Sequence, residues 1–456
     1  MSSSGTELHP IVAEESGGSL VKMVRDPWYW IVYGAILAGI LALIQAHLHG
    51  VFLRPLVAAA ETHHWARFLI FPSTLWIVMG TLLLVFRTVV WMAYHPFPSA
   101  TFDGAPQLTV IIPAYNEGPM VLKSIESVVA AIYPHDRLEI FVVDDGSRDD
   151  TWKYIKEAAT RWPELVRPVR FAKNQGKRAA LAAGFKAARG DVIVTIDSDS
   201  ALQPGALLAI VGPFRDPKVG AVAGKVGAYN RSAGLLPRML HVRYILSFDV
   251  LRAVESSYGT VYCCPGALTA YRAGIVREVL APWLKQTFLG AACTYGEDRA
   301  LTNWILSLGY FTVYQRSAVV HTVVPTNYKT MCKMFLRWDR SYVREEIRFM
   351  GIVWKRPPLS ASLALWDRFV TNLRYPVNYA SLVLLAVLTW EHPYMLARFL
   401  LAVGIVGLFY SLYFLRSERS AEFLLAIVFS YFSFFTMFWI FPYALFTVRA
   451  RSWLTR

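Results

Sequence analysis

Residues 191–199 read DVIVTIDSD, in which the strand-like run Asp191–Ile196 leads directly into a loop with two aspartates. Two stretches upstream have the same arrangement, since Leu108–Pro113 (LTVIIP) and Glu139–Val143 (EIFVV) are short apolar runs followed by polar loops. Continuous β-branched runs separated by helical segments are typical of a parallel sheet that is covered on both faces. The sequence therefore predicts an α/β domain whose ligands bind beyond the carboxyl ends of its strands.

The intervening segments complete this pattern. One more strand is predicted over Val166–Phe171, and helices are predicted over three segments: Lys123–Ile132, Thr151–Thr160 and Lys177–Ala188. Polar residues follow three of the strands, so a parallel arrangement brings them to one edge of the sheet. These candidate ligand residues are Tyr115 and Glu117, then Asp144 and Asp145, then Asp197 and Asp199.

Asp197 and Asp199 form a compact pair of carboxylates at the end of a predicted strand. Mg²⁺ and Mn²⁺ prefer oxygen ligands and often complete their coordination shell with substrate phosphates. A metal held here would stabilise the charge on a departing nucleoside diphosphate. The alternative is an exposed acidic turn or a helix cap, and the neighbouring polar loops favour the metal site.

The other loops indicate a nucleotide. Asp144 and Asp145 could hold a uracil or a ribose, although the segment DDGSRDDT also contains residues that cap helices. Tyr115 offers a flat face for a base, with ordinary packing as the alternative. Lys177 and Arg178 stand at the start of a helix, where the dipole disfavours cations, so binding of diphosphate oxygens would explain them. The alternative for these two cations is a solvated basic turn.

The stretch Gly296–Arg299 (GEDR) precedes another predicted helix. One of its acids, Glu297 or Asp298, could deprotonate an acceptor hydroxyl during transfer of a sugar. Taken alone, the stretch would more simply be a helix cap. Its meaning therefore depends on what lies near it in the fold.

Residues 328–350 mix aromatic and basic side chains at helical spacing. Arg337, Arg340 and Arg344 lie three and four residues apart, so they share one face of a helix. Such a helix can lie at a membrane surface and present cations to a diphosphate, or it can bind lipid headgroups alone. Residues 235–253 are also amphipathic, and we predict that they are interfacial only.

Two long apolar runs precede the α/β region, at residues 28–48 and 68–92. Each has the ~20 residues that a helix needs to cross a membrane. Lys22 and Arg25 precede the first run, which predicts a cytosolic N-terminus by the positive-inside rule. The predicted organisation has four parts: a cytosolic tail (1–27), two transmembrane helices (28–92), a cytosolic transferase domain with interfacial helices (93–350) and a C-terminal transmembrane region (351–456).

The C-terminal region has apolar runs at 377–390, 396–415 and 421–448. Three full crossings would put the end of the chain outside, whereas the basic tail Arg449–Arg456 favours the cytosol. The last run is long and contains Pro442, so we predict that it is bent or partly re-entrant. A plain third crossing with an external tail is the alternative.

Composition agrees with a membrane protein. The 456 residues are 55% hydrophobic and 17% charged, with a net charge of +14. A basic excess can favour nucleic acid, anionic lipid or an anionic substrate, but the basic residues are scattered and no nucleic-acid motif occurs, so no nucleic-acid partner is predicted. The four cysteines form no CxxC pair, which argues against a zinc site, and their small number suits a reducing compartment: Cys263, Cys264, Cys293 and Cys332.

Taken in order, these loops resemble the processive, inverting glycosyltransferases of family 2, especially hyaluronan synthases and the chitin-oligosaccharide synthases of nodulating bacteria. By motif the resemblance covers residues 105–350. It implies a GT-A-type nucleotide-sugar domain inserted between transmembrane helices. In that family the PxYNE and DDGS loops (113–117 and 144–147) hold the nucleoside, and an NxGKR segment (174–178) marks the hyaluronan and chitin branch.

The resemblance also implies roles around the acceptor. Asp298 matches the catalytic base, and Asp197 and Asp199 match the diphosphate and metal ligands. The RWxxS segment beginning at Arg337 resembles a helix that caps both substrates, and residues 263–268 resemble an acceptor loop. The residues implied in substrate binding are Tyr115, Glu117, Asp144, Asp145, Lys177, Arg178, Asp197, Cys264, Gly266, Glu297, Arg299, Arg337, Trp338, Arg340 and, in a WGTR-like tail, Trp453.

Several positions depart from the family pattern. Met334 stands where the QxxRW motif has glutamine, and Leu454 replaces the glycine of WGTR. The acceptor loop reads PGAL where SGPL is usual, with Pro265 and Ala267 changed. These changes lie near the expected acceptor, so they bear on which sugar is used more than on whether transfer occurs.

The sequence thus predicts a metal-dependent, inverting polymerase in the plasma membrane, with UDP-sugar donors, a growing polysaccharide as acceptor and lipid around its helices. UDP-GlcNAc with UDP-GlcA would give hyaluronan, and UDP-GlcNAc alone would give a chitin-like chain. An alternative in the same class transfers one sugar to a polyprenyl phosphate. An alternative in another class is a transporter with a degenerate transferase domain, against which the intact acids argue.

Overall fold

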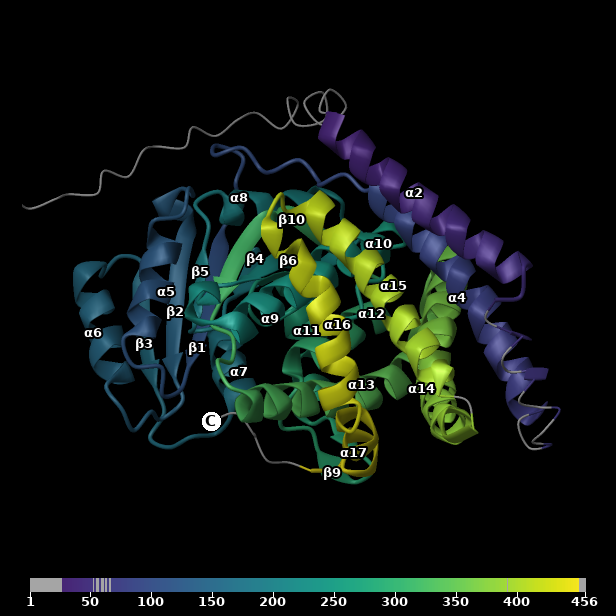
Figure 1. The fold of residues 1–456 in the computed structure, drawn as a ribbon. Helices are drawn as coiled ribbons and strands as arrows, with labels where there is room; N and C mark the ends of the chain where they lie inside the picture. The colour runs from purple at the N-terminus through teal and green to yellow at the C-terminus, as the bar shows by residue number, and fades with distance from the viewer. Residues whose placement is uncertain are drawn as a thin grey trace, which may run out of the picture.

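A computed structural model describes residues 27–450, except 52, 55, 56, 59, 60, 62, 63, 65, 66 and 392. A mixed eight-stranded sheet forms the centre of the molecule, in the order β3-β2-β1-β4-β7-β6-β10-β5 (Figure 1). Its strands are β1 (Leu108–Ala114), β2 (Leu138–Asp144), β3 (Val166–Arg170), β4 (Val192–Thr195), β5 (Ser200–Leu202), β6 (Val219–Ala228), β7 (Thr269–Arg272) and β10 (Phe311–Thr322). A separate hairpin pairs β8 (Thr287–Phe288) with β9 (Ala291–Ala292).

The first half of the sheet is the parallel unit that the sequence predicts. β1 pairs in parallel with β2 and with β4, and β2 pairs in parallel with β3. The helices α5 (Met120–Val129) and α6 (Thr151–Arg161) pack in the hydrophobic core on one face, and α7 (Lys177–Ala187) packs in the core on the other. Every residue of β1 is buried, which explains why its sequence is a continuous apolar run.

The second half of the sheet differs from a purely parallel arrangement. β7 runs antiparallel to both β4 and β6, and β5 runs antiparallel to β10. These strands are short or rich in glycine and alanine, as in VGAVAGKVGA of β6, so the β-branched signal is weak. The parallel prediction therefore holds for the first four strands, and the complete sheet is mixed.

Helices cover the second half and extend toward the apolar region. They are α8 (Ala206–Val211), α9 (Leu235–Ile245), the π-helical segment Leu246–Leu251, α10 (Arg252–Ser257), α11 (Ala273–Leu284), α12 (Glu297–Ser307) and α13 (Tyr328–Ile352). The predicted amphipathic helix over 328–350 is confirmed as α13. Its N-terminus is capped by Asn327, whose side-chain oxygen accepts a hydrogen bond of 2.9 Å from the Thr330 amide.

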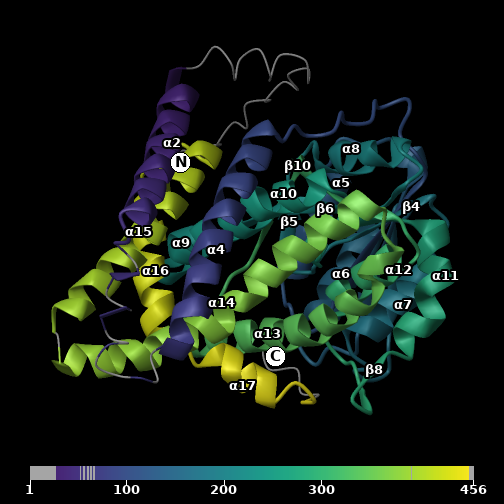
Figure 2. The ribbon, with the colours of Figure 1, turned by 90° about the vertical axis from the view of Figure 1, so that its right-hand side faces the viewer.

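The apolar helices lie together on one side of the sheet (Figure 2). They are α2 (Pro27–Leu48), α4 (Arg67–Ala93), α14 (Pro358–Glu391), α15 (Tyr394–Ser417), α16 (Leu424–Met437) and α17 (Ile440–Phe446). Among the described residues, three helices are long and apolar enough to cross a membrane: Pro27–Leu48, Ile70–Ala93 and Tyr394–Ser417. They match the predicted runs at 28–48, 68–92 and 396–415.

The other two apolar runs are not simple spans. Residues 377–390 form the end of the 34-residue helix α14, which is not among the helices that are long and apolar enough to cross a membrane. The run 421–448 is bent as predicted, because Ala421–Met437 and Ile440–Phe446 meet at 45°. The break lies before Pro442, however, and this proline does not cause it. Pro442 is in the first turn of α17, where a proline removes no helical hydrogen bond. The tail residues 451–456, including Trp453 and Leu454, lie outside the described residues.

Ion pairs join the apolar helices to one another and to the rest of the molecule. Arg87 of α4 pairs with Asp367 of α14 at 2.8 Å. Glu418, which follows α15, contacts His241 of α9 at 3.0 Å and Lys225 of β6 at 3.4 Å. The sheet domain and the apolar helices are therefore connected by polar contacts as well as by packing.

Candidate active site

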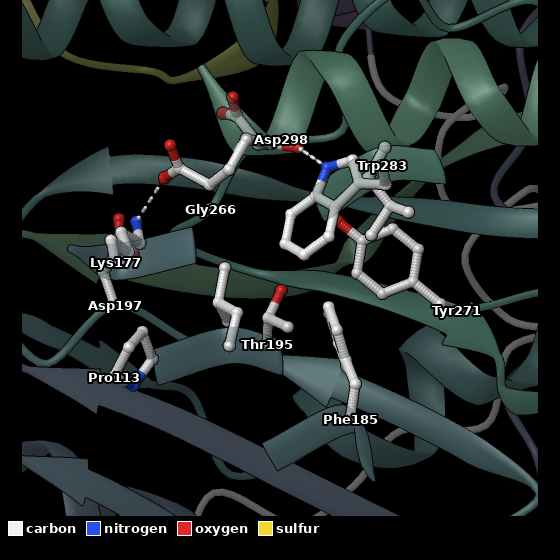
Figure 3. A pocket seen from close by; sticks show the side chains of 12 residues that line it. Pro113, Lys177, Phe185, Thr195, Asp197, Gly266, Tyr271, Trp283 and Asp298 are labelled. Carbon is white, nitrogen blue, oxygen red and sulfur yellow. Dashed lines mark hydrogen bonds and ion pairs between the residues drawn. The ribbon is translucent and has the colours of Figure 1, made fainter. Parts of the chain in front are cut away.

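The two acidic motifs of the sequence meet around one lysine. Lys177, the first residue of α7, places its Nζ 2.5 Å from Asp197 Oδ1 and 3.2 Å from Glu297 Oε1. Asp197 follows β4, whereas Glu297 begins α12, about one hundred residues later in the chain. Figure 3 shows Lys177, Asp197 and Asp298 around the same pocket. The loop after β4, the start of α7 and the start of α12 therefore converge on one place.

A small pocket lies between these charged groups. Its polar lining is Lys177, Thr195, Asp197, Gly266, Glu297 and Asp298, and its apolar lining is Pro113, Leu181, Phe185, Tyr271, Trp283 and Leu301 (Figure 3). Trp283 of α11 closes one side, with its indole N–H donating to the Glu297 carbonyl at 3.1 Å. An apolar pocket with a few convergent charged groups is the usual form of a ligand site.

The charges in the pocket stabilise one another. Burial opposes the charge on Lys177, but Asp197 and Glu297 together raise the pKa of its ammonium group. Burial likewise opposes the charge on Glu297, yet Lys177 lowers the pKa of that carboxyl group. Burial together with the neighbouring Asp197 raises the pKa of Asp199 to about 6. A second cation beside Asp199 would relieve this repulsion.

Asp298 is set apart from its neighbour Glu297. Its Oδ1 accepts a hydrogen bond of 2.7 Å from the Arg299 amide, and its Oδ2 lies 3.7 Å from the Cys263 thiol. Burial and the charge of Glu297 raise the pKa of Asp298. A carboxylate with a raised pKa that faces a pocket is a candidate general base.

Two glycines allow the loops of the site to approach closely. A Cβ atom on Gly266 would lie 2.9 Å from Lys177 Nζ and 3.1 Å from Asp197 Oδ1, so this loop sits directly against the ion pair of Lys177 and Asp197. Gly296 has a φ of +70°, and a Cβ there would lie 2.0 Å from Ser341 Oγ of α13. Glycine at 296 therefore lets α13 pack over the start of α12.

The loops predicted to hold a nucleoside are tied to one another. Asp145 accepts backbone hydrogen bonds from Gln175 (2.7 Å) and Gly176 (2.8 Å), which fixes the loop before Lys177. Glu117 accepts a hydrogen bond of 2.9 Å from Ser198 Oγ, between the two aspartates of the DxD motif. These contacts show how the loops are positioned, while contact of either acid with a ligand stays a prediction.

Some predicted ligand residues are buried instead of lining the pocket. Asp144 is fully buried, with Oδ1 accepting from the Ser147 amide and Oδ2 lying 3.1 Å from Arg170 Nε. Arg178 donates to the Trp283 carbonyl at 2.7 Å and lies over that indole ring. Cys264 is also buried. Sequence alone did not indicate which side of α7 or of the acceptor loop would face inward.

The remaining residues of these motifs lie at the edge of the site. Tyr115 directly follows β1 and is half-buried, so its ring stays a candidate surface for a base. Arg299 places its guanidinium 5.4 Å from the ring centre of Tyr342.

The basic face of α13 divides into two parts. Burial opposes the charge on Glu297, whereas Lys177 and, more weakly, Arg337 lower the pKa of this carboxyl group, so Arg337 is close enough to Glu297 to act on it electrostatically. Arg340 donates to Thr447 at 2.9 Å, just after α17. Arg344 donates to the Tyr295 carbonyl at 2.6 Å. Arg340 and Arg344 thus hold the end of the described chain and the loop before Gly296.

Two further residues belong near the site and were missed by the sequence motifs. Tyr244 of α9 places its hydroxyl 3.6 Å from Met334 Sδ, the position where the family has glutamine. Its ring lies 5.9 Å from that of Trp338, which is half-buried. Tyr295 donates a hydrogen bond of 2.8 Å to the Ala450 carbonyl, so the last described residue lies beside the segment that precedes α12, the helix that begins with Glu297 and Asp298. The methionine at position 334, in place of the family's glutamine, was the one sequence feature that could have pointed to Tyr244.

Comparison with known proteins identifies the family of this chain. The family model described as Glycosyl transferase family 2 matches residues 109–280. A hyaluronan synthase of Streptococcus pyogenes is 33% identical over 389 residues, which cover 83% of this chain and 90% of that protein. An N-acetylglucosaminyltransferase of Rhizobium leguminosarum bv. viciae is 31% identical over 357 residues, covering 77% and 82%.

A solved structure supports the fold independently. The mannosyltransferase PcManGT from Pyrobaculum calidifontis, solved with GDP-Man and Mn²⁺, superposes with a TM-score of 0.56 at 21% identity, covering 79% of this chain and 99% of that one. At this identity the likeness concerns the fold alone. The mixed sheet, the converging acidic loops and the similarity to relatives over most of their length lead to one conclusion: the chain is a glycosyltransferase that belongs to glycosyl transferase family 2.

Proposed function

We propose that this glycosyltransferase polymerises sugars from UDP-sugar donors and passes the polysaccharide toward its membrane helices. The observation that carries the proposal is the meeting of Asp197, Lys177 and Asp298 at one pocket, next to a bundle of apolar helices. The relatives named hyaluronan synthase and N-acetylglucosaminyltransferase support a polymer or oligomer of amino sugar as product. UDP-GlcNAc, alone or with UDP-GlcA, is the expected donor.

In the proposed reaction, an acceptor hydroxyl attacks the anomeric carbon of the donor sugar. The bond from that carbon to the diphosphate oxygen breaks, and UDP leaves with the electron pair. Asp298 takes the hydroxyl proton as the new glycosidic bond forms. A single displacement of this kind inverts the anomeric configuration. Lys177 and Arg337 stabilise the negative charge that develops on the departing UDP.

A divalent cation fits the acidic pair. Asp197 and Asp199 would hold it. Among the described residues, no group of three or more histidine, cysteine or acidic side chains is placed to hold a metal ion. Two carboxylates are typical of Mg²⁺ or Mn²⁺ sites that substrate phosphates complete. When bound, the cation supplies charge neutralisation for the diphosphate.

We propose a cytosolic site in the plasma membrane, with residues 93–350 as the transferase domain and 28–92 and 351–456 as membrane regions. The contact between Tyr295 and Ala450 supports this arrangement, because it places Ala450, next to the basic residue Arg449, beside the segment that leads to Asp298, and basic residues favour the cytosolic side. Trp453 would then approach the nucleotide, and Tyr115, Glu117, Asp145 and Trp338 would contact the substrates.

The test is UDP release by the purified chain in nanodiscs, with UDP-GlcNAc, UDP-GlcA and UDP-Glc supplied singly and in pairs, with Mn²⁺ or Mg²⁺. We expect turnover that EDTA abolishes and that either metal restores, with products of many sugars. A product with one sugar on a polyprenyl phosphate would show that the enzyme transfers a single sugar and does not polymerise. Silence with every donor in the presence of metal would contradict the proposed function.

A further inference from the structure

A cysteine thiol points at the proposed base. The Sγ atom of Cys263 donates a hydrogen bond to Asp298 Oδ2 at 3.7 Å, a separation that the larger radius of sulfur allows. The cysteine is 7% exposed, whereas Asp298 is half-buried and lines the pocket. The proposed reaction does not use this thiol, although the thiol contacts the group that takes the proton.

Two further hydrogen bonds hold the cysteine in this place. The backbone amide of Cys264 donates to Thr302 Oγ1 at 3.1 Å, and the Thr302 hydroxyl donates to the Asp298 carbonyl at 2.8 Å. Thr302 is fully buried, so water does not compete for these bonds. Residues 263 and 264 are therefore fixed to the first two turns of α12 through the backbone as well as through the thiol.

The thiol faces the carboxylate in its protonated form. Burial, reinforced by the negative charge of Asp298, raises the pKa of Cys263 to about 12, so the sulfur keeps its proton at neutral pH. A protonated thiol is a weak hydrogen-bond donor, whereas the thiolate is the form that acts as a nucleophile. The geometry thus suits Cys263 to hold a neighbouring group and not to attack a substrate.

The contact leaves room on Asp298 for an acceptor hydroxyl. Oδ1 accepts from the Arg299 amide at 2.7 Å, and Oδ2 accepts from Cys263. An ionised carboxylate has about four lone-pair sites, so sites remain free for a substrate. Because the two donors approach different oxygens, together they fix the plane of the carboxylate.

Charged and titratable groups surround Asp298 from several elements. They are Glu297 and Arg299 on α12, Lys177 on α7, Tyr271 on β7 and the thiols of Cys263 and Cys264. Burial and Glu297 raise the pKa of Asp298, whereas Lys177 and Arg299 lower it. A hydrogen bond to the ionised form acts in the same direction as these two cations.

We propose that Cys263 is a positioning residue for proton transfer, whose thiol orients the Asp298 carboxylate and couples it to the loop 263–268. This inference rests on the proposed role of Asp298 and adds a residue to it. The same loop carries Gly266, which lies against Lys177 and Asp197. One short segment therefore contacts the proposed base at one point and the Lys177–Asp197 ion pair at another, so it sets their relative positions.

The first arm of the test measures how the rate of UDP release depends on pH, with the full chain in nanodiscs and Mn²⁺. Cys263→Ala removes the donor, so Asp298 keeps its proton up to a higher pH. The acid limb of the kcat profile should move upward by about half a pH unit, the size expected for one weak hydrogen bond. KM should stay within about twofold, because the thiol acts through Asp298.

Two matched variants separate positioning from packing. Cys263→Ser keeps a hydroxyl donor and should return the acid limb to its wild-type position or below it. Cys332→Ala removes a thiol in α13 that is also 7% exposed, and it should leave the limb unmoved. A Cys263→Ala protein that is less stable in thermal unfolding but has the wild-type acid limb would overturn the inference, since the thiol would then only fill space.

The second arm is infrared spectroscopy of the S–H stretch and needs no turnover. This band moves to lower frequency when a thiol donates a hydrogen bond, and subtracting the spectrum of Cys263→Ala isolates the band of Cys263. Asp298→Ala, with its own Cys263→Ala reference, removes the acceptor and should shift the band to higher frequency. An unchanged band would overturn the inference. Absence of UDP release with every donor would refute the proposed function instead, and the infrared arm would still decide whether the thiol binds Asp298.

Discussion

At the scale of single residues, the site holds two adjacent acids in different states. Glu297 pairs with Lys177 and keeps its charge, whereas burial and that same charge raise the pKa of Asp298. Environments that push the pKa values of neighbouring acids apart are how enzymes assign separate roles to them. Glu297 is therefore expected to orient Lys177, and Asp298 to move the proton.

Replacing the proposed base tests this assignment. Asp298→Asn removes the proton acceptor but keeps the shape of the side chain, so kcat should fall by about 10²–10⁴-fold, the usual contribution of a general base. Binding of UDP, measured calorimetrically with Mn²⁺, should stay within a factor of about two. Asp136→Asn, whose side chain is 80% exposed, is the control and should leave kcat unchanged. Loss of UDP binding together with misfolding would make Asp298 a structural residue.

The pH dependence follows from the same pair. A general base must be unprotonated, so the raised pKa of Asp298 means that kcat falls on the acid side at a higher pH than an ordinary aspartate would give. Glu297→Gln removes the negative neighbour, which should lower that pKa and move the acid limb of the profile to lower pH. Initial rates of UDP release between pH 5 and 8 measure the limb. An acid limb that does not move in Glu297→Gln would contradict the assignment.

At the scale of elements, the packing of α13 over the start of α12 depends on a glycine. Gly296→Ala would strain a residue with a φ of +70° and drive a methyl group into Ser341. Left-handed strain and overpacking together should cost about 2–4 kcal/mol and reduce activity strongly. Thermal unfolding in detergent measures the loss.

The control for this prediction lies in α13 itself. A Cβ on Gly351 would meet nothing within 4 Å, so Gly351→Ala should leave stability unchanged or raise it slightly. Adding Ser341→Gly to Gly296→Ala should relieve the clash with the new methyl group but leave the backbone strain at residue 296, so only part of the stability should return. Equal stability of Gly296→Ala and wild type would show that α13 shifts freely.

Elements with a strong local signal were predicted, and those defined by partners far away in sequence were not. β1, β2 and β4 are buried on both faces, so their own residues are continuous apolar runs. β6 and β7 are defined by each other, and close packing requires small residues such as Gly224, which touches Leu268. Small residues carry little strand signal, which is why the antiparallel half could not be predicted.

The site followed the same rule. Lys177, Asp197 and Glu297 were found because charged residues beside strand ends and helix starts stand out in sequence. The inward turn of Arg178 and the contact of Tyr244 with Met334 were not found, because both depend on how helices rotate when they pack. Motif resemblance supplies residue types, and packing decides which side chains face the substrate.

At the scale of the whole molecule, a buried ion pair joins two apolar helices. Asp367 is 1% exposed and pairs with Arg87, which is about a quarter exposed. Asp367→Asn would leave the arginine uncompensated, at a cost of about 3 kcal/mol. We expect a lower unfolding temperature in detergent, whereas Glu157→Gln, which breaks an exposed pair with Arg161, should have little effect.

A double variant separates the pair from its surroundings. Arg87→Met with Asp367→Leu removes both charges and should recover most of the stability lost by Asp367→Asn, because apolar residues can replace a buried pair. If the double variant is as unstable as the single one, the pair instead fixes the orientation of α4 and α14. Unfolding temperatures of the three proteins in one detergent give the answer.

The reversed direction of β7 has a consequence for how a transferase can arise from a nucleotide-binding sheet. In a parallel sheet, the loop that enters a strand always lies at the edge opposite the loop that leaves its neighbour. Because β7 is antiparallel to β4, the loop entering β7 and the loop leaving β4 share an edge, and Gly266 touches Asp197. One inverted strand added to the parallel unit thus brings the loop that carries Gly266 against the loop that carries Asp197, so a new loop can reach the Asp197 edge of the sheet without any change in β1, β2 and β4.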